Sequence, residues 1–275
     1  MTPSNVGLPE TVHIVPLGHE IDRAVKPLLP HKAERVHLLA IPPQADFDAR
    51  MKEKQTDYTK KVIDRLEEYN IRVQFHPVNM FDILEVLKTV SRIIIEEKER
   101  GNNIFVNMSS CGRKTAFAVT IAAMFHEVDV YYVSADMYAT GEFAEKERDH
   151  GMSIVESGNI ERLQRFPIRK PDPTNIQLLA ELYRRKINNK SAMRSDDIIT
   201  LFHDLGVQGF EKKPDAMRTT EKLKQKRPLL NRINRMLKEL VDQEYITKKK
   251  DGKEFFVDIT DAGSHIACVS GLIKK

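Results

Sequence analysis

Cysteine is scarce in this sequence, and long apolar runs are missing. The 275 residues include only Cys111 and Cys268, which stand far apart in unrelated patterns. We therefore expect neither a disulfide framework nor a cysteine-based metal site, and the composition fits a reducing cytoplasm. No apolar run reaches the length of a membrane span, and residues 1–10 lack the basic and apolar regions of a signal peptide. These absences predict a cytoplasmic protein that needs no membrane, metal or resident cofactor.

Two common nucleotide-binding motifs are also missing. The segment after the first apolar run reads VPLGHE (residues 15–20), where an NAD-type oxidoreductase would carry G-x-G-x-x-G. Residues 112–115 read GRKT, which has neither the G-K-[ST] spacing nor the upstream glycine of a P-loop. The sequence therefore argues against a dinucleotide-dependent oxidoreductase and against a P-loop NTPase.

Residues 101–115 (GNNIFVNMSSCGRKT) nevertheless have the pattern of a ligand-binding turn. An apolar run at 104–106 has strand character, and a helical pattern begins at Thr115. A strand, a turn of small residues and a helix N-terminus together offer backbone N–H groups to an anion. The stretch predicts a site for a phosphate-bearing ligand, although a tight turn with two solvated cations stays open. The candidate binding residues are Asn107, Ser109, Ser110, Gly112, Arg113 and Lys114.

Strand and helix patterns alternate over the first two thirds of the chain. Apolar strands are expected at 11–15, 35–41, 71–75, 104–106 and 128–133, and helices at 21–29, 45–69, 81–100 and from 115 onward. This alternation predicts an α/β, Rossmann-like, doubly wound and mainly parallel sheet. Such sheets bind ligands beyond the carboxyl ends of their strands, where the strand order reverses. Three loops meet that condition: 16–20, 107–114 and 134–137.

The pattern changes near residues 169–174, where Pro171 and Pro173 disfavour helix. We expect one domain at 1–168, a linker at 169–174 and a second domain at 175–275. The second domain should contain helices 175–187 (capped by Thr174), 196–205 (capped by Ser195), 216–226 and 228–243 (with Pro228 in its first turn), and a short helix at 261–270. A β-hairpin is expected at 245–257, turning at Asp251-Gly252. This is the order of a winged helix-turn-helix.

The second domain is also the basic part of the chain. Residues 171–275 hold 21 Lys and Arg against 15 Asp and Glu, whereas the remainder holds 23 against 25. Such a basic module suggests a nucleic-acid partner, because cations reach phosphates and guanine edges and asparagine can pair with adenine. A helical dimerisation domain with a solvated basic face is the alternative. The candidate DNA-binding residues are Lys226, Arg227, Asn231, Arg232, Asn234, Arg235, Lys238, Lys249, Lys250 and Lys253.

With these residues in view, the whole chain resembles a known arrangement. Its N-terminal two thirds resemble a CARF domain (CRISPR-associated Rossmann fold), and its last third resembles an archaeal winged helix-turn-helix of the HFX_2341-type regulators. Such domains carry an Asn after the fourth strand, a Ser or Thr two residues later, small residues and then a cation, although Cys111 stands where glycine is common. The resemblance adds further ligand-lining positions in the other two loops: Gly18, His19, Glu20 and Ser134.

The resemblance also implies a function. It implies a homodimer whose two CARF-like domains form one symmetric pocket for a nucleotide second messenger, a cyclic oligoadenylate and commonly the tetra-adenylate. Binding would alter the spacing of two modules that read double-stranded DNA, as in a ligand-responsive transcriptional regulator. A ring nuclease that cleaves the same ligand is the alternative, with phosphate stabilisation by Ser110, Arg113 or Lys114. No general base is evident beside these residues; His13, His19 and His126 are candidates by residue type alone.

Overall fold

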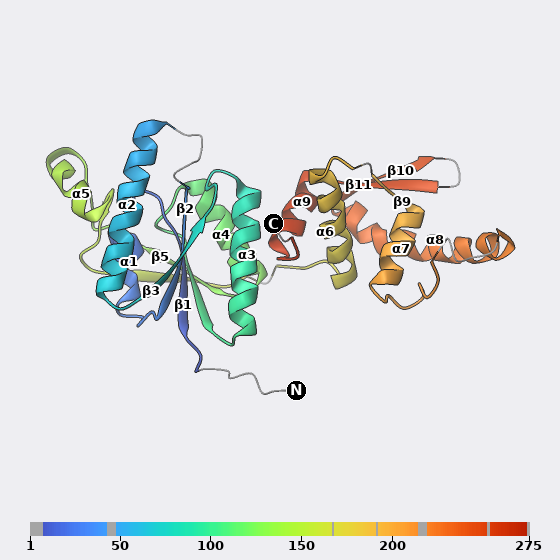
Figure 1. Cartoon of the computed structure of the whole chain (residues 1–275), viewed down its shortest axis with the longest axis horizontal. Helices are drawn as coiled ribbons and strands as arrows, with labels where there is room; N and C mark the ends of the chain where they lie inside the picture. Colours follow the sequence, from blue (N-terminus) through green and yellow to red (C-terminus); the bar gives the residue numbers. More distant parts are fainter. Residues whose placement is uncertain are drawn as a thin grey trace. The chain divides into compact units, whose positions relative to one another are not determined.

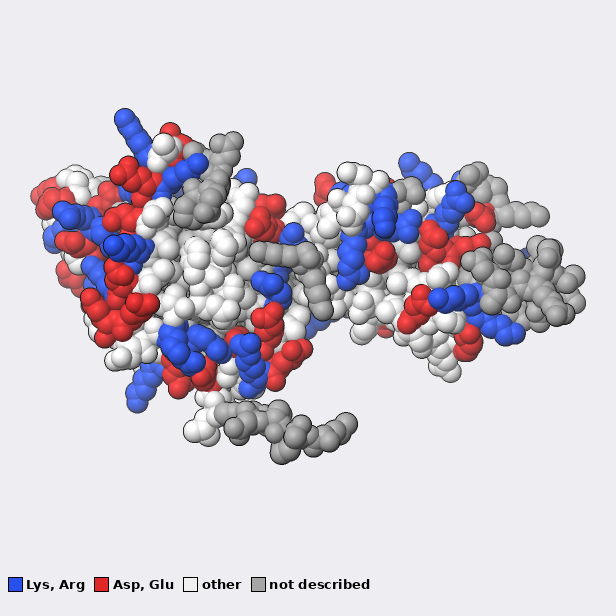
Figure 2. Space-filling view, in the orientation of Figure 1, with Lys and Arg blue, Asp and Glu red and all other residues white. Residues whose placement is uncertain are grey.

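The computed structural model describes residues 8–42, 48–166, 168–190, 192–213, 219–251 and 254–273. The chain divides into two compact units, Met1–Ile168 and Arg169–Lys275, and Figure 1 shows the elements of each. On the face of the first unit seen in Figure 2, cations and carboxylates are interspersed.

The first unit is built on a six-stranded sheet in the order β3-β2-β1-β4-β5-β8. The first five strands are parallel, and β8 runs antiparallel beside β5. Strand order therefore reverses between β1 and β4, which lie side by side at the centre of the sheet. The strands are β1 (Thr11–Pro16), β2 (Arg35–Ala40), β3 (Arg72–Pro77), β4 (Asn103–Asn107), β5 (Asp129–Val133) and β8 (Ile160–Leu163).

Helices cover both faces of this sheet. They are α1 (Asp22–Val25), the 3₁₀ turn η1 (Lys26–Leu28), α2 (Ala49–Glu68), α3 (Ile83–Glu99) and α4 (Arg113–Phe125). On one face, Val15 and Leu38 of the sheet pack with Tyr58, Val62 and Leu66 of α2. Helices α3 and α4 pack together on the other side (Figure 1). The predicted doubly wound, mainly parallel sheet is confirmed.

The segment between β5 and β8 folds back over the start of α1. It contains β6 (Met137–Tyr138), the 3₁₀ helix η2 (Gly141–Lys146), α5 (Glu147–His150) and β7 (Ser153–Ile154). The buried Asp22 carboxylate accepts hydrogen bonds from His150 Nδ1 at 2.9 Å and from the Val155 amide at 3.0 Å. Gly151, at φ +85°, lies so close to the backbone of residues 19–21 that a Cβ on it would be 2.5 Å from the Ile21 nitrogen. Only glycine fits this crossing.

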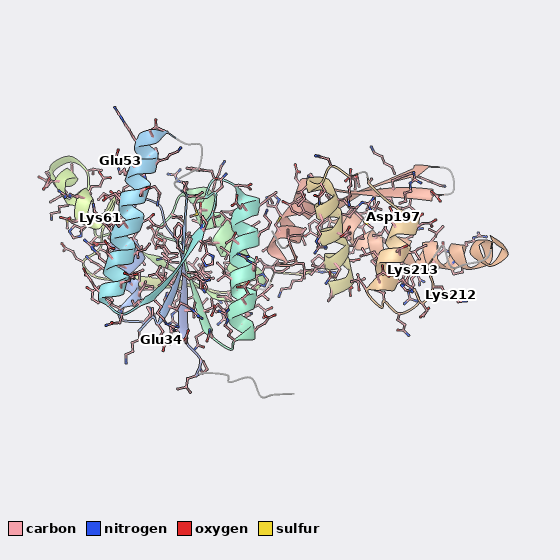
Figure 3. The ribbon with its side chains drawn as sticks, viewed as in Figure 1. Glu34, Glu53, Lys61, Asp197, Lys212 and Lys213 are labelled. Atoms are coloured by element: carbon pink, nitrogen blue, oxygen red, sulfur yellow. The ribbon has the colours of Figure 1, made fainter. Side chains whose placement is uncertain are left out.

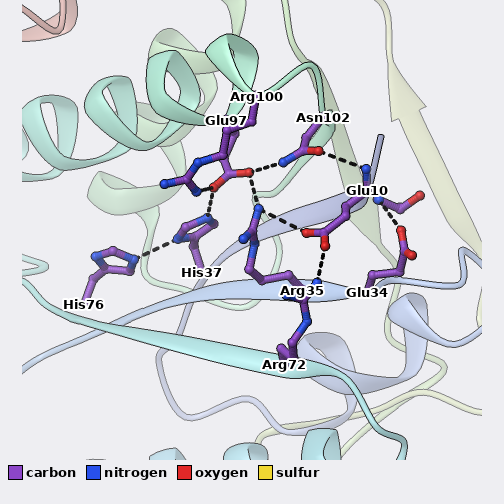
Figure 4. Close-up of polar contacts among 10 residues, drawn as sticks. Glu10, Glu34, Arg35, His37, Arg72, His76, Glu97, Arg100 and Asn102 are labelled. Carbon is purple, nitrogen blue, oxygen red and sulfur yellow. Dashed lines mark hydrogen bonds and ion pairs between the residues drawn. The ribbon is translucent and has the colours of Figure 1, made fainter. Parts of the chain in front are cut away.

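A buried ion network closes the amino-terminal edge of the sheet (Figure 4). The fully buried Glu97 carboxylate accepts hydrogen bonds from Asn102 at 2.6 Å, from Arg100 at 2.6 Å and from His37 at 3.1 Å, and it also pairs with Arg35. Burial alone would raise the pKa of Glu97, but the hydrogen bond from Asn102 and the charge of Arg35 hold that pKa below its usual value. The network joins α3, β2 and the start of β4 at the edge opposite the predicted ligand loops.

The second unit has the element order of a winged helix domain, as predicted. Its elements are α6 (Pro173–Ile187), β9 (Met193–Arg194), α7 (Ser195–Asp204), α8 (Thr219–Asp242), β10 (Ile246–Asp251), β11 (Glu254–Ile259) and α9 (Asp261–Val269). The hairpin β10–β11 pairs with β9 into a three-stranded antiparallel sheet, and the sequence did not predict this third strand. Ile198, Phe202, Ile233, Leu237 and Val257 form part of its core.

Three local expectations in this unit are wrong. Asp172, not Thr174, caps α6, because its carboxylate accepts the Thr174 N–H at 2.8 Å while Pro173 opens the helix. Helix α7 includes Ser195, and the Asp197 carboxylate (Figure 3) accepts the Arg194 N–H at 3.2 Å. The predicted break before Pro228 is also wrong: α8 continues through this proline, at the loss of one backbone hydrogen bond.

Candidate functional site

The loops after β1 and β4 meet at the carboxyl edge of the sheet, where the strand order reverses. The Gly18 amide donates a 2.7 Å hydrogen bond to the Ser110 carbonyl, and Ser110 Oγ donates to the Pro16 carbonyl at 2.8 Å. A cavity of about 1010 Å³ opens beside them. This is the place where open α/β sheets bind their ligands.

Eight of the ten sequence-predicted ligand residues line this cavity: Gly18, His19, Glu20, Ser109, Ser110, Gly112, Arg113 and Lys114. The other two, Asn107 and Ser134, do not line it. Asn107 is fully buried; its Nδ2 donates to the Arg23 carbonyl at 2.7 Å, and its Oδ1 accepts from the Ser109 amide at 2.9 Å and from Ser109 Oγ at 2.6 Å. Asn107 therefore holds the loop after β4 in place from within the core and does not face the cavity.

The two serine hydroxyls are already donating within the protein. Ser109 Oγ donates to Asn107, and Ser110 Oγ donates to Pro16. A hydroxyl has a single hydrogen, so in this conformation the serines offer only oxygen lone pairs to a ligand. The donors for an anion must come from other groups in the cavity.

Helix α4 supplies those donors. It begins at Arg113, two residues earlier than predicted, behind an N-cap residue, Gly112, that makes no side-chain cap. The first backbone N–H groups of a helix have no partner within the helix, and the helix dipole adds positive potential there. Arg113 and Lys114 are exposed in the same first turn and line the cavity. The Thr115 hydroxyl donates to the Met80 carbonyl at 2.6 Å, which fixes the turn against the loop after β3.

His19 and Glu20 form part of the cavity wall after β1. Burial raises the pKa of Glu20, whose carboxylate accepts hydrogen bonds from the Ser153 amide at 3.0 Å and the Ser153 hydroxyl at 2.8 Å. Burial, and then the charge of Lys54, lower the pKa of His19, whose ring lies 5.3 Å from the Tyr58 ring. Glu20 therefore holds the β7 segment in place, and His19 presents a neutral imidazole to the cavity at pH 7.

Sequence reasoning missed an apolar part of the lining. Four large side chains are 45–58% exposed and line the same cavity: Met51, Phe81, Tyr138 and Met152. They come from α2, from the loop after β3 and from the segment around β6 and β7, so no spacing along the chain groups them. Exposed apolar side chains gathered at one cavity offer contact surface to flat apolar groups of a ligand. Arg23 and Tyr132 also line the cavity and were not predicted.

In the second unit, most candidate DNA-binding residues are exposed. Arg232 is an exception: it is half-buried, with its guanidinium 5.7 Å from the centre of the Phe210 ring. Asn234 accepts a hydrogen bond from Lys248 of the wing. The side chain of Lys226 and the whole of Lys253 lie outside the described residues. The exposed candidates are Arg227, Asn231, Asn234, Arg235 and Lys238 on α8, and Lys249 and Lys250 on β10.

The described part of the chain holds neither a cluster of metal-binding side chains nor a membrane-spanning helix. Within it, no group of three or more His, Cys, Asp or Glu side chains is placed to hold a metal ion. None of its helices is both long enough and apolar enough to cross a membrane.

Two known families match separate parts of the chain. Residues 11–138 match the family described as HFX_2341_N-like, N-terminal, and residues 174–271 match the DUF6293 C-terminal winged helix domain. Both matches confirm the resemblance seen in the sequence. Among curated proteins, uncharacterized protein MJ1513 of Methanocaldococcus jannaschii is 24% identical over 153 residues, which cover 53% of this chain and 44% of that protein. The chain thus spans less than half the length of this relative.

Two solved structures share little sequence identity with this chain. Enterococcus italicus Csm6 bound to cyclic hexa-2′-fluoro-hexa-dAMP is 13% identical, with a TM-score of 0.41 over 85% of this chain and 57% of that one. Can2 from Sulfobacillus thermosulfidooxidans, in complex with cyclic tetra-adenylate, is 13% identical, with a TM-score of 0.38 over 95% of this chain and 64% of that one.

Proposed function

We propose that this chain, which joins an HFX_2341_N-like N-terminal domain to a DUF6293-type winged helix domain, is a ligand-responsive DNA-binding transcriptional regulator of the cytoplasm. The proposal rests on the presence of two features in one chain. The first unit holds a large cavity at the strand-order switch point, with an uncapped helix N-terminus and two exposed cations beside it. The second unit is a winged helix domain with exposed basic and amide side chains on α8.

The ligand we propose is a nucleotide with several phosphates, and specifically a cyclic oligoadenylate such as the tetra-adenylate. The first turn of α4, with Arg113 and Lys114, suits phosphate. Met51 and Phe81 suit flat bases, which bury well against apolar and aromatic side chains. The resemblance of the β4 loop to CARF domains favours the cyclic form, and it favours a homodimer in which two such cavities form one pocket.

The DNA partner follows from the second unit. Exposed cations on α8 and on the wing would contact phosphates, and Asn231 or Asn234 could pair with adenine in the major groove. A ligand that changes how two such modules are spaced in a dimer changes their fit to two half-sites. We therefore expect ligand binding to alter DNA affinity.

Cleavage of the ligand is the second candidate function, and one observation favours it. Of the three histidine candidates, His19 alone lines the cavity, and because burial and then Lys54 lower its pKa, its ring is neutral at pH 7 and has a free lone pair for a proton. Incubating excess protein with cyclic tetra-adenylate and separating the products tests this function. Linear products that disappear with His19→Ala support it, and intact ligand after prolonged incubation contradicts it.

The regulator is tested by calorimetric titration with cyclic tri-, tetra- and hexa-adenylate. We expect wild type to bind one of them, and Arg113→Ala/Lys114→Ala to weaken binding at least about tenfold, since each charged hydrogen bond is worth about 1.5–3 kcal/mol. Lys60→Ala is the matched control, because Lys60 is an exposed cation of α2 that does not line the cavity. Absence of heat with all three ligands overturns the proposed sensor.

A further inference from the structure

Arg23 is a buried cation at the cavity whose charge is only partly compensated. It lies in α1, and only 8% of the residue is exposed, yet it contributes to the cavity lining. Burying a charged group is costly unless it is paired and hydrogen-bonded.

Few of the five guanidinium N–H donors are used. Nη2 donates to the Tyr132 hydroxyl at 3.2 Å, and Nη1 approaches Glu20 Oε1 at 3.5 Å, the limit of a hydrogen bond. The buried Nε has no hydrogen-bond partner among the described residues. The partner on Tyr132 is a hydroxyl and not a carboxylate, and the Glu20 carboxylate is already engaged by the Ser153 amide and hydroxyl. The guanidinium thus lacks a close bidentate anion, which is the partner its planar fork fits best.

The position of Arg23 is fixed in advance. Its guanidinium lies 5.4 Å from the centre of the Tyr132 ring and donates to that residue's hydroxyl, and the Arg23 carbonyl accepts from the buried Asn107. A side chain held in this way loses little conformational entropy when a ligand arrives. The other cations of the cavity, Arg113 and Lys114, come from a different element, the first turn of α4.

We propose that Arg23 is a ligand-contacting residue that takes one phosphate group of the ligand, separate from the phosphate held at the first turn of α4. The inference rests on the proposed function and deepens it. It assigns to the cavity a ligand with at least two anionic groups, so an oligonucleotide would be preferred over a nucleoside monophosphate. Arg23 would set this preference, and Tyr132 would position Arg23.

The test compares the affinities for cyclic tetra-adenylate and for AMP of wild type, Arg23→Gln and Arg23→Lys. We expect both variants to lose at least about tenfold in affinity for the tetra-adenylate, because a lysine keeps the charge but not the planar fork. The loss for AMP should be smaller, since AMP can use the α4 site alone. Thermal unfolding of each variant, measured alongside, shows whether it is folded.

Two further variants separate ligand contact from a structural role. Arg65→Gln is the matched control, because Arg65 is 34% exposed, lies 3.9 Å from Asp22 and does not line the cavity; we expect less than a twofold change. Tyr132→Phe removes the phenol partner of Arg23 but leaves the guanidinium, so its loss should be smaller than that of Arg23→Gln. If Arg23 acted only by bonding Tyr132, the two losses would be equal, and that result overturns the inference.

The outcomes also distinguish the inference from the proposed function. Wild-type affinity in folded Arg23→Gln or Arg23→Lys overturns the role of Arg23 and leaves the sensor intact. If Arg23→Gln does not fold, Arg23→Lys and Tyr132→Phe decide the question. If the wild type binds no cyclic oligoadenylate, the sensor and the inference that rests on it are both overturned.

Discussion

The Gly18 amide and the Ser110 carbonyl, 92 residues apart in sequence, form a 2.7 Å hydrogen bond that joins the two central loops of the candidate site. A Cβ on Gly18 would lie 3.4 Å from that carbonyl oxygen and 3.5 Å from the Cys111 Cα. The loop after β4 therefore cannot move away from the loop after β1 without breaking this hydrogen bond. Both backbones meet directly beside the cavity, so their separation sets part of its shape.

We predict that Gly18→Val pushes the two loops apart and weakens binding of cyclic tetra-adenylate by at least about tenfold. The methyl groups of the valine would press against the backbone of Ser110 and Cys111, which cannot move aside as a flexible side chain can. Gly18→Ala is the internal control, and we expect less than a threefold change from its single methyl. Calorimetric titration of both variants measures the effect. Equal affinities in Gly18→Val and wild type would contradict the coupling of the loops.

Gly151 gives a stability prediction for the segment between β5 and β8. Gly151→Ala would place a methyl 2.5 Å from the Ile21 nitrogen at φ +85°, so we expect a loss of about 3 kcal/mol in the free energy of unfolding. Gly158→Ala is the matched control: its φ is +62°, but nothing lies within 4 Å of its Cβ, so only about 1 kcal/mol should be lost. Urea unfolding measures both variants, and equal losses would contradict the close crossing.

The first domain could be predicted from the sequence because four of its five parallel strands are largely buried, although the edge strand β3 is mostly exposed. Such strands are continuous apolar runs, and β1, β2, β4 and β5 stand out for that reason. Strand β8 was missed because it is a four-residue edge strand, IERL, whose two central residues are charged and exposed, and because it pairs with β5 across a long connection. The two-residue β9 exists only through its pairing with β11.

The candidate site was predictable only in part, for a related reason. The small residues and cations of 107–114 are consecutive, so their pattern is visible in the chain. Arg23, Phe81 and Met152 reach the cavity from elements far apart in sequence, and tertiary packing alone brings them together. The direction of the Ser110 hydroxyl likewise depends on the Pro16 carbonyl, 94 residues away.

Arg232 and Arg235 of α8 should behave differently in DNA binding. Arg235 is exposed, so Arg235→Ala should weaken binding to a duplex of random sequence and reduce the slope of log affinity against log salt by about one. Arg232 packs over Phe210, and a Cβ on Gly209 would lie 2.0 Å from its Nη1, so the side chain fills space beside that loop. Arg232→Ala should therefore lower the thermal stability of the second unit as well.

Fluorescence anisotropy at several salt concentrations, together with thermal unfolding, separates these effects. A salt slope unchanged in Arg235→Ala would remove this residue from the proposed DNA-binding surface. Wild-type stability in Arg232→Ala would show that its stacking on Phe210 contributes nothing measurable.

The buried His13 predicts how the stability of the first unit depends on pH. Its Nδ1 lies 3.0 Å from the Tyr131 hydroxyl, its Nε2 has no partner among the described residues, and its ring stacks on Phe105. Burial, and then the neighbouring His31, lower the pKa of His13 from 6.5 to about 3. In the unfolded chain His13 takes up a proton below about pH 6.5, whereas in the folded protein it stays neutral. Stability should therefore fall as the pH drops below 6.5, by about 1.4 kcal/mol per pH unit from this residue.

We expect wild type to lose about 2 kcal/mol from His13 between pH 6.5 and pH 5, and we expect His13→Phe to lack this part of the loss. Urea unfolding followed by circular dichroism at pH 8, 7, 6 and 5 measures it. Between pH 8 and pH 7, where His13 is mostly neutral in both states, the stability difference between wild type and variant should change by only about 0.1–0.2 kcal/mol. If that difference changes no further down to pH 5, then His13 is protonated to the same extent in the folded and unfolded chains. Burial would in that case not control its charge.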